Sequence, residues 1–111
     1  MQSSDAIVVM TTLASEGEAV TLVKALLDRR LIACGTVVPA ARSFYRWEGK
    51  VADEAEVLVI MKTRSARLDA LEMAFDELHP YKVPELLALP VAAGNAKYLS
   101  WIGAETVLGV A

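Results

Sequence analysis

A small set of side chains in this sequence has the chemistry expected of a metal or ligand site. His79 is the only histidine, and its imidazole suits copper and other divalent ions. Glu85 follows shortly after and offers the carboxylate oxygens that harder cations prefer. The sequence therefore makes His79 and Glu85 candidate ligands for copper or another divalent metal ion.

Other side chains combine aromatic surface with both signs of charge, a mixture typical of small-ligand sites. Lys62 closes one predicted strand, whereas Tyr81 and Glu85 precede another, so we expect both segments on the rim of a sheet. Trp47 and Lys50 lie at the tip of a predicted hairpin. The same two residues of a neighbouring subunit's hairpin could reach that rim. The candidate ligand cleft comprises Cys34, Trp47, Lys50, Lys62, Tyr81 and Glu85.

Each candidate also has an ordinary structural interpretation. His79 ends a predicted helix, where a histidine commonly interacts with the last carbonyl groups and the helix dipole. Cys34 could be a small buried core residue. This role is commoner for a free cysteine than that of a soft-metal or redox thiol. Lys62 and Glu85 can form an ion pair in an interface without any ligand. No Ser-His-acid set, phosphate-binding glycine loop or HExxH motif appears, so the sequence does not indicate an enzyme.

The first elements that would position these side chains follow from periodicity and capping residues. Residues 6–12 form an apolar, β-branched run typical of a buried strand. An S-x-x-E capping box that begins at Ser15, followed by apolar residues at helical spacing, predicts a helix over residues 16–30. A second helix is predicted after Thr63 or Ser65, either of which is a suitable cap.

The remaining elements are strands and a final short helix. Residues 32–47 and 50–63 read as one long antiparallel hairpin, in which Pro39 marks a bulge or an edge position. The second helix is expected to stop at His79-Pro80, and a last strand is predicted within residues 84–91. Asn95 then caps a short C-terminal helix.

The order strand-helix-strand-strand-helix-strand predicts an α+β fold of the ferredoxin-like, split βαβ type: an antiparallel sheet with helices on one face. The first helix spans about 22 Å at 1.5 Å per residue, whereas the first arm of the hairpin spans about 50 Å. The hairpin therefore extends beyond its helical cover, and its tip still carries Phe44, Tyr45 and Trp47. We expect this tip and the bare sheet face to contact another subunit.

Composition points the same way. The chain has 111 residues, of which 55% are apolar, and we interpret residues 1–111 as a single domain. A chain this short cannot hide so much apolar surface by itself, so self-association is the leading explanation. No apolar run is long enough to span a membrane, and no secretory signal is recognisable. A net charge of −3 gives no footprint for nucleic acid, and the single cysteine with no export signal predicts a cytoplasmic location.

Several blocks together resemble the CutA divalent-cation tolerance family. They include an R-L-I-A-C segment ending at Cys34, the S-F-Y-R-W-E-G-K block of residues 43–50 and the H-P-Y-K-V-P-E block of residues 79–85. The resemblance covers nearly the whole chain. It implies a ferredoxin-like homotrimer, similar in architecture to the PII signalling proteins, and a role in tolerance of copper and other divalent ions. The alternative is a PII-like scaffold whose intersubunit cleft binds a small organic ligand or a partner protein.

The sequence departs from the family at the copper ligands that the resemblance implies. Copper-binding members have been described with a cysteine near the end of the first strand and paired histidines before the Pro-Tyr. Here Thr11 and Leu78 occupy two of those places, and His79 alone matches.

Overall fold

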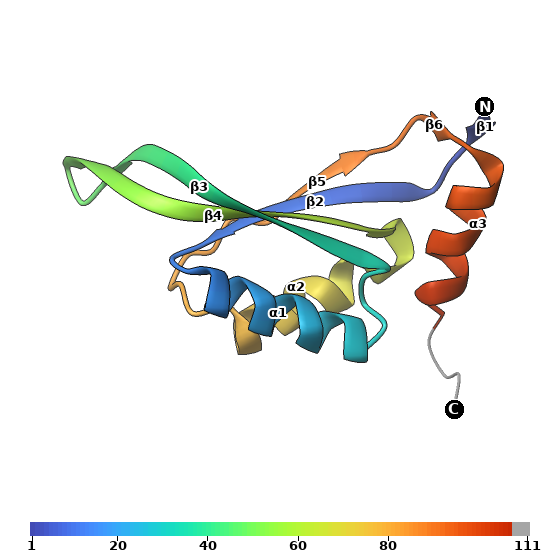
Figure 1. Ribbon diagram of the computed structural model, residues 1–111, viewed down its shortest axis with the longest axis horizontal. Coiled ribbons are helices and arrows are strands. Elements are labelled where there is room, and N and C mark those ends of the chain that lie inside the picture. Colours follow the sequence, from blue (N-terminus) through green and yellow to red (C-terminus); the bar gives the residue numbers. More distant parts are fainter. Residues whose placement is uncertain (108–111) are drawn as a thin grey trace.

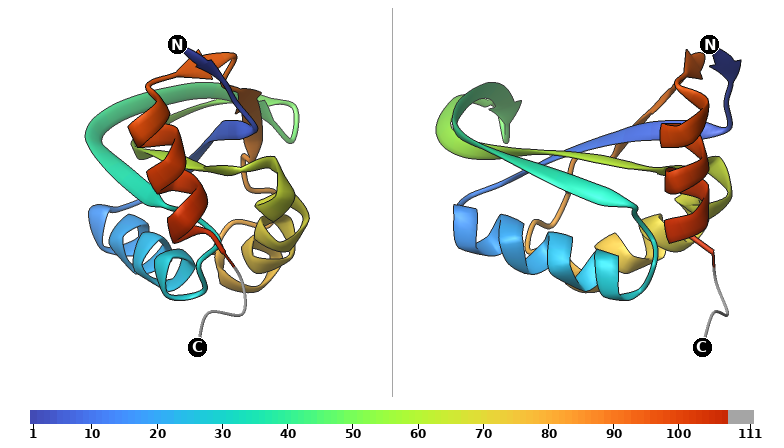
Figure 2. Two further views of the ribbon diagram at one scale, coloured as in Figure 1. Left: turned by 90° about the vertical axis from the view of Figure 1, so that its right-hand side faces the viewer. Right: turned by 45° about the vertical axis from the view of Figure 1, so that its right-hand side comes forward.

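The computed structural model describes residues 1–107 and is built around one antiparallel sheet (Figure 1). The sheet contains β2 (Ala6–Leu13), β3 (Cys34–Trp47), β4 (Lys50–Arg64) and β5 (Leu87–Pro90), in the spatial order β3-β4-β2-β5. Two helices, α1 (Glu16–Asp28) and α2 (Leu68–Leu78), lie side by side on one face, as Figure 2 also shows. The predicted ferredoxin-like α+β fold is confirmed.

Three elements lie at the end of the sheet away from the hairpin tip. A short ladder joins β1 (Gln2–Ser3) to β6 (Ala93–Gly94), and it was not predicted. The helix α3 (Ala96–Glu105) begins as expected, with the Asn95 side chain accepting hydrogen bonds from the backbone N–H groups of Lys97 and Tyr98. Most of the apolar end of the chain, residues 108–111, lies outside the described residues.

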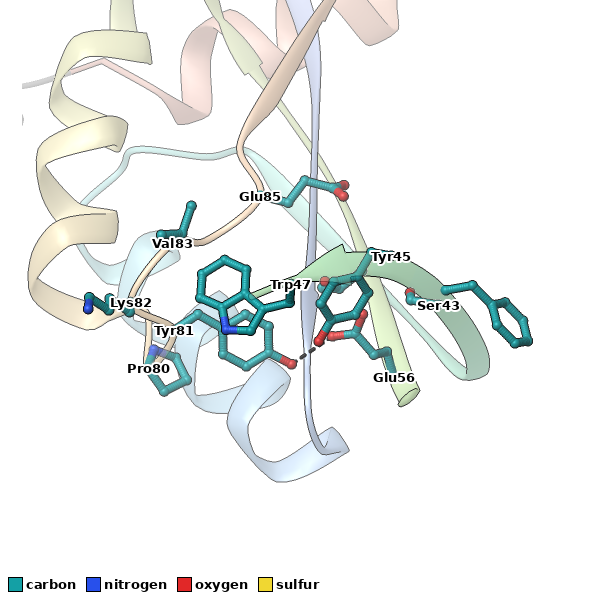
Figure 3. Close-up of a pocket in the computed structure, with 11 residues that line it drawn as sticks. Ser43, Tyr45, Trp47, Glu56, Pro80, Tyr81, Lys82, Val83 and Glu85 are labelled. Carbon is teal, nitrogen blue, oxygen red and sulfur yellow. Dashed lines mark hydrogen bonds between the residues drawn. The ribbon is translucent and has the colours of Figure 1, made fainter. Parts of the chain in front are cut away.

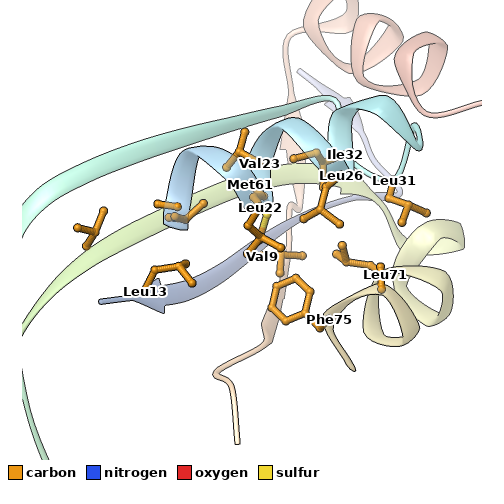
Figure 4. Packing of buried hydrophobic residues seen from close by; sticks show 14 of the residues in the cluster. Val9, Leu13, Leu22, Val23, Leu26, Leu31, Ile32, Met61, Leu71 and Phe75 are labelled. Carbon is orange, nitrogen blue, oxygen red and sulfur yellow. The ribbon is translucent and has the colours of Figure 1, made fainter. Parts of the chain in front are cut away.

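The core fills the space between the two helices and the sheet (Figure 4). Alternate residues of β2 and β4 point toward the helices, so that Val9 and Met61 are fully buried against them. Phe75 of α2 lies in the same cluster, and burial of each such side chain stabilises the fold by about 1.5–3 kcal/mol. Gly35 lets β3 approach α1, since a Cβ there would lie 2.8 Å from a methyl carbon of Val23.

Two helix boundaries differ from prediction. The N-terminal cap of α1 is correct, because the Ser15 hydroxyl accepts from the Glu18 N–H, but the helix ends at Asp28 rather than at residue 30. Arg30 adopts a left-handed φ of 56°, which cannot continue a helix. Neither Thr63 nor Ser65 caps the second helix through its side chain: the Thr63 hydroxyl instead donates to the Leu31 carbonyl.

The long hairpin of β3 and β4 is confirmed and extends past the helices (Figure 1). Its turn is Glu48-Gly49, and both residues have a positive φ. A two-residue turn of this kind matches the right-handed twist of the two strands that it joins. The register shifts between Val38 and Ala41, so the bulge expected at Pro39 is present. In residues 1–107, no helix is both long and apolar enough to cross a membrane.

Candidate functional site

A pocket of about 660 Å³ lies between the outer part of the hairpin and the segment that follows α2 (Figure 3). The hairpin contributes Tyr45, Trp47 and Glu56, whereas the segment after α2 contributes Tyr81 and Glu85. Of the predicted ligand cleft, the structure therefore brings Trp47, Tyr81 and Glu85 together within one chain. The pocket uses the chain's own hairpin, whereas the sequence suggested a neighbour's hairpin for this role.

Glu56 is the most enclosed acid of the pocket. It lies on β4 with 6% of its surface exposed, and its Oε2 accepts a hydrogen bond of 2.6 Å from the Tyr81 hydroxyl. Burial and this hydrogen bond raise the pKa of Tyr81, so the phenol keeps its proton and remains a donor. The contact fixes the segment after α2 against the hairpin.

Glu85 brings a second carboxylate to the same pocket. Partial loss of solvent, together with the charge of Glu56, raises the pKa of Glu85. None of the ion pairs found within residues 1–107 involves either acid. Lys82 also lines the pocket, but its ammonium group points away from both carboxylates (Figure 3). Within residues 1–107, the two acids of the pocket therefore have no ion-pair partner.

His79 contacts two residues that line this pocket, Thr12 and Tyr81, and is almost completely buried, with 7% of its surface exposed. Its Nδ1 accepts a hydrogen bond of 3.1 Å from the Tyr81 N–H. Its Nε2 lies 3.1 Å from both the Thr12 carbonyl oxygen and the Thr11 hydroxyl. Since Nδ1 is an acceptor, Nε2 carries the proton, and it donates to the Thr12 carbonyl. Burial lowers the pKa of His79, which favours this neutral form.

This arrangement bears on the expected metal ligands. Both ring nitrogens of His79 are engaged in hydrogen bonds, so a metal ion could bind the ring only by displacing one of them. Within residues 1–107, no group of three or more histidine, cysteine or acidic side chains is placed to hold an ion. The donors present in one chain therefore do not fit a preformed copper site. The Thr11 hydroxyl nevertheless lies beside the ring, at the position where copper-binding members are described with cysteine.

Two of the other predicted cleft residues, Cys34 and Lys62, lie at the opposite end of the β3–β4 ladder. Cys34 pairs in register with Lys62, whereas Trp47 pairs with Lys50 next to the turn. The Cys34 Sγ lies 3.9 Å from the Tyr98 hydroxyl of α3. Within one chain, Cys34 and Lys62 therefore do not line the pocket.

Lys62 makes its own contacts there. Its Nζ lies 5.8 Å from the centre of the Tyr98 ring, and the Tyr98 hydroxyl raises the pKa of Lys62. Lys50 is exposed near the hairpin turn and does not line the pocket.

Sequence reasoning missed Glu56, Tyr45 and Tyr98. Glu56 lies in a strand whose neighbours are acidic or apolar, so nothing in the local pattern distinguishes it from a solvent-facing residue. Tyr45 alternates with Trp47 along the same strand, and that period of two could have placed both on one face. Nothing in the sequence indicated that Tyr98 of the last helix would contact Cys34 and Lys62.

Comparisons with known proteins agree on one family. Residues 7–105 match the family described as CutA1 divalent ion tolerance protein. The "Divalent-cation tolerance protein CutA" of Thermus thermophilus is 44% identical over 99 residues, which is 89% of this chain and 96% of that protein. Its namesake from Pectobacterium atrosepticum is 42% identical over 91% of this chain and 92% of the relative.

Solved structures give the same result. The "Divalent cation tolerance protein (Cut A1)" of Thermus thermophilus superposes with a TM-score of 0.89 at 43% identity, covering 92% of this chain and 99% of that one. CutA1 from Oryza sativa gives a TM-score of 0.91 at 40% identity, covering 96% and 98% of the two chains. The chain therefore belongs to the CutA1 divalent ion tolerance protein family.

Proposed function

We propose that this protein acts in divalent-cation tolerance as a cytoplasmic homotrimer that binds a divalent metal ion and catalyses no reaction. The observation that supports metal binding is the pair of acids, Glu56 and Glu85, that line one pocket without an ion-pair partner among residues 1–107. The family match supports the tolerance role, because its members carry that description in their names.

The homotrimer is supported by the sheet face that the helices leave uncovered. The register aligns Val8 with Leu89 and Met10 with both Leu87 and Ile60, so these side chains form one apolar surface. Leu87 and Leu89 are 58% and 50% exposed, which is unusual for two leucines on the same face of one strand. A second copy covering this face would account for the high apolar content of the chain.

The metal site is proposed at Glu85 and Glu56. Carboxylates suit hard divalent ions such as Mn²⁺ better than copper, which prefers imidazole and sulfur ligands. Two acids are too few for a complete site, so a further donor must come from water or from another copy. Copper, the ion that the family resemblance implies, would instead need the His79 ring, which is held by Thr12 and Tyr81.

Calorimetric titration of the assembled protein with Mn²⁺ and Cu²⁺ tests this assignment. We expect saturable Mn²⁺ binding that weakens at least about tenfold in Glu85→Gln, since a charged ligand is lost. Glu72→Gln is the matched control, because Glu72 is an exposed acid of α2 that does not line the pocket. Copper binding that is lost in His79→Asn but kept in Glu85→Gln would instead place the metal at the histidine.

A gain-of-function variant sharpens the copper question. Thr11→Cys would place a thiol beside the His79 ring, because the present hydroxyl lies 3.1 Å from Nε2. We expect this variant to bind copper more tightly than the parent chain, whereas Thr11→Ser should not. Equal copper affinity in all three proteins would show that position 11 does not contribute a ligand.

A further inference from the structure

The pocket has aromatic walls that a bare metal ion does not need. Tyr45 and Trp47 of β3 are 43% and 46% exposed, a large apolar area to leave in solvent. Tyr81 lines the same pocket, and its hydroxyl donates to Glu56 (Figure 3). Among the aromatic contacts of residues 1–107, none joins Tyr81 to Tyr45 or Trp47. The rings therefore border the pocket instead of stacking on one another.

The charges of the pocket agree with these walls. Glu56 lines the pocket and accepts a hydrogen bond from the Tyr81 hydroxyl, and Glu85 adds a second acid. The face of an aromatic ring is itself electronegative and attracts cations. The ammonium group of Lys82 points away, so the carboxylates and rings together favour a positive guest and disfavour an anion.

We propose that this pocket binds an organic ammonium ion. The positive nitrogen would approach Glu56 and Glu85, while its alkyl groups contact the rings of Tyr45, Trp47 and Tyr81. A hydrated metal ion gains from the acids alone, whereas an alkylated cation gains from the acids and the rings together. The pocket volume of about 660 Å³ is in the range of small-molecule sites.

This inference rests on the pocket of the proposed function but on different side chains. The metal proposal requires the two acids and gives Trp47 no role. The ammonium proposal requires both the acids and the rings. The variant Trp47→Leu therefore separates the two, because it should retain Mn²⁺ binding and lose the organic cation.

Choline and its neutral isostere 3,3-dimethylbutanol are suitable probes, since they match in shape and differ in charge. We would measure both by ligand-observed NMR titration of the assembled protein. Choline should bind saturably, and the isostere at least about tenfold more weakly, because it gains neither the carboxylate nor the cation–π contact. Glu85→Gln and Trp47→Leu should each weaken choline binding, whereas Glu72→Gln should not. Glu85 and Trp47 are exposed, so both variants should fold, which circular dichroism checks.

A second readout locates the probe. In a Trp101→Phe background the remaining indole is Trp47, so choline should change its fluorescence. Equal affinity for choline and the isostere would overturn the proposal, because the pocket would then recognise shape and apolarity only. Absence of saturable choline binding would also overturn it, as would unchanged binding in Trp47→Leu. If Mn²⁺ still binds in any of these cases, the proposed metal function survives.

Discussion

The two ends of the β3–β4 ladder carry opposite chemistry. From the middle of the ladder toward the turn lies a pocket bordered by aromatic rings, which Glu56 and Glu85 also line. At the other end, Lys62 places its ammonium over the Tyr98 ring beside Cys34. Both ends use aromatic surface, but at one end two acids have no ion-pair partner within residues 1–107, whereas at the other end a cation lies over a ring.

This difference explains what one chain can and cannot assemble. The sequence suggested a single cleft that contained Lys62 together with Trp47 and Glu85. The ladder places Lys62 and Trp47 at opposite ends, so no rearrangement of side chains can unite them in one subunit. Only a second copy could bring the basic end of one chain to the acidic end of another, which makes assembly the first property to test.

The largest effect is expected from breaking the assembly. Leu89→Asp would place a carboxylate on the bare sheet face, and burying it without a partner costs several kcal/mol. We expect light scattering to report a mass of one chain instead of three. Met73→Asp is the matched control, because Met73 is exposed on α2, on the opposite face of the sheet. A monomeric parent protein, or a trimeric Leu89→Asp variant, would contradict the interface proposed for this face.

The next effect concerns the histidine that supports the pocket end. His79→Ala removes the hydrogen bonds to Thr12 and Tyr81 and leaves a small cavity, so we expect a loss of about 2–4 kcal/mol in unfolding free energy. His79→Asn should recover part of this loss, since an asparagine oxygen can accept from the N–H two residues later. Urea denaturation measures both variants.

The matched change at the other end of the ladder should lower the unfolding free energy by less. Cys34 is half-buried, and its only polar contact within the described residues is the long one to Tyr98. Cys34→Ala should therefore cost under about 1 kcal/mol. If Cys34→Ala were as damaging as His79→Ala, the pocket end would not be the more constrained of the two.

These two sites also show how far the sequence could lead. Periodicity and capping predicted the four strands of the main sheet, the first helix and the hairpin, because apolar spacing and turn residues act locally. The sequence also placed His79 correctly at a helix end, and its ring does bond a carbonyl oxygen. The carbonyl belongs to Thr12 of β2, however, not to the helix that His79 terminates.

What the sequence could not predict depends on contacts between distant segments. The bond between Tyr81 and Glu56 joins a loop to a strand that precedes it by a whole helix. Nothing in the spacing of either segment shows that they meet. The separation of Lys62 from Trp47 was in principle predictable, because pairing across a hairpin follows from its turn. The predicted cleft instead assumed contact between neighbouring chains.

The buried histidine should make the stability of the protein depend on pH. This effect is expected to be smaller than that of His79→Ala. Burial lowers the pKa of His79 below its ordinary 6.5, although the Thr12 carbonyl, Glu18 and Glu56 oppose the shift. Below pH 6.5 the unfolded chain binds the proton first, so stability should fall as pH decreases toward the folded-state pKa. Glu85, whose pKa is raised, acts in the opposite direction at lower pH.

Comparison with His79→Asn isolates this contribution, since Glu85 is common to both proteins. Urea midpoints recorded between pH 7.5 and pH 5 should decline more steeply for the parent chain. Parallel profiles would show that His79 is not held neutral by the fold, and the support it gives to Tyr81 would need another explanation.

The smallest effect belongs to the basic end. A double-mutant cycle of Lys62→Met and Tyr98→Leu, followed by urea denaturation, should give a coupling of about 0.5–1 kcal/mol, the usual strength of an exposed cation–π contact. A measurable coupling would mean that Lys62 is already engaged within its own chain and is not free to neutralise the acids of a neighbour's pocket. Zero coupling would leave its ammonium available for that role. The pocket of an assembled trimer would then be less acidic than that of one chain, and both cation proposals would be weakened together.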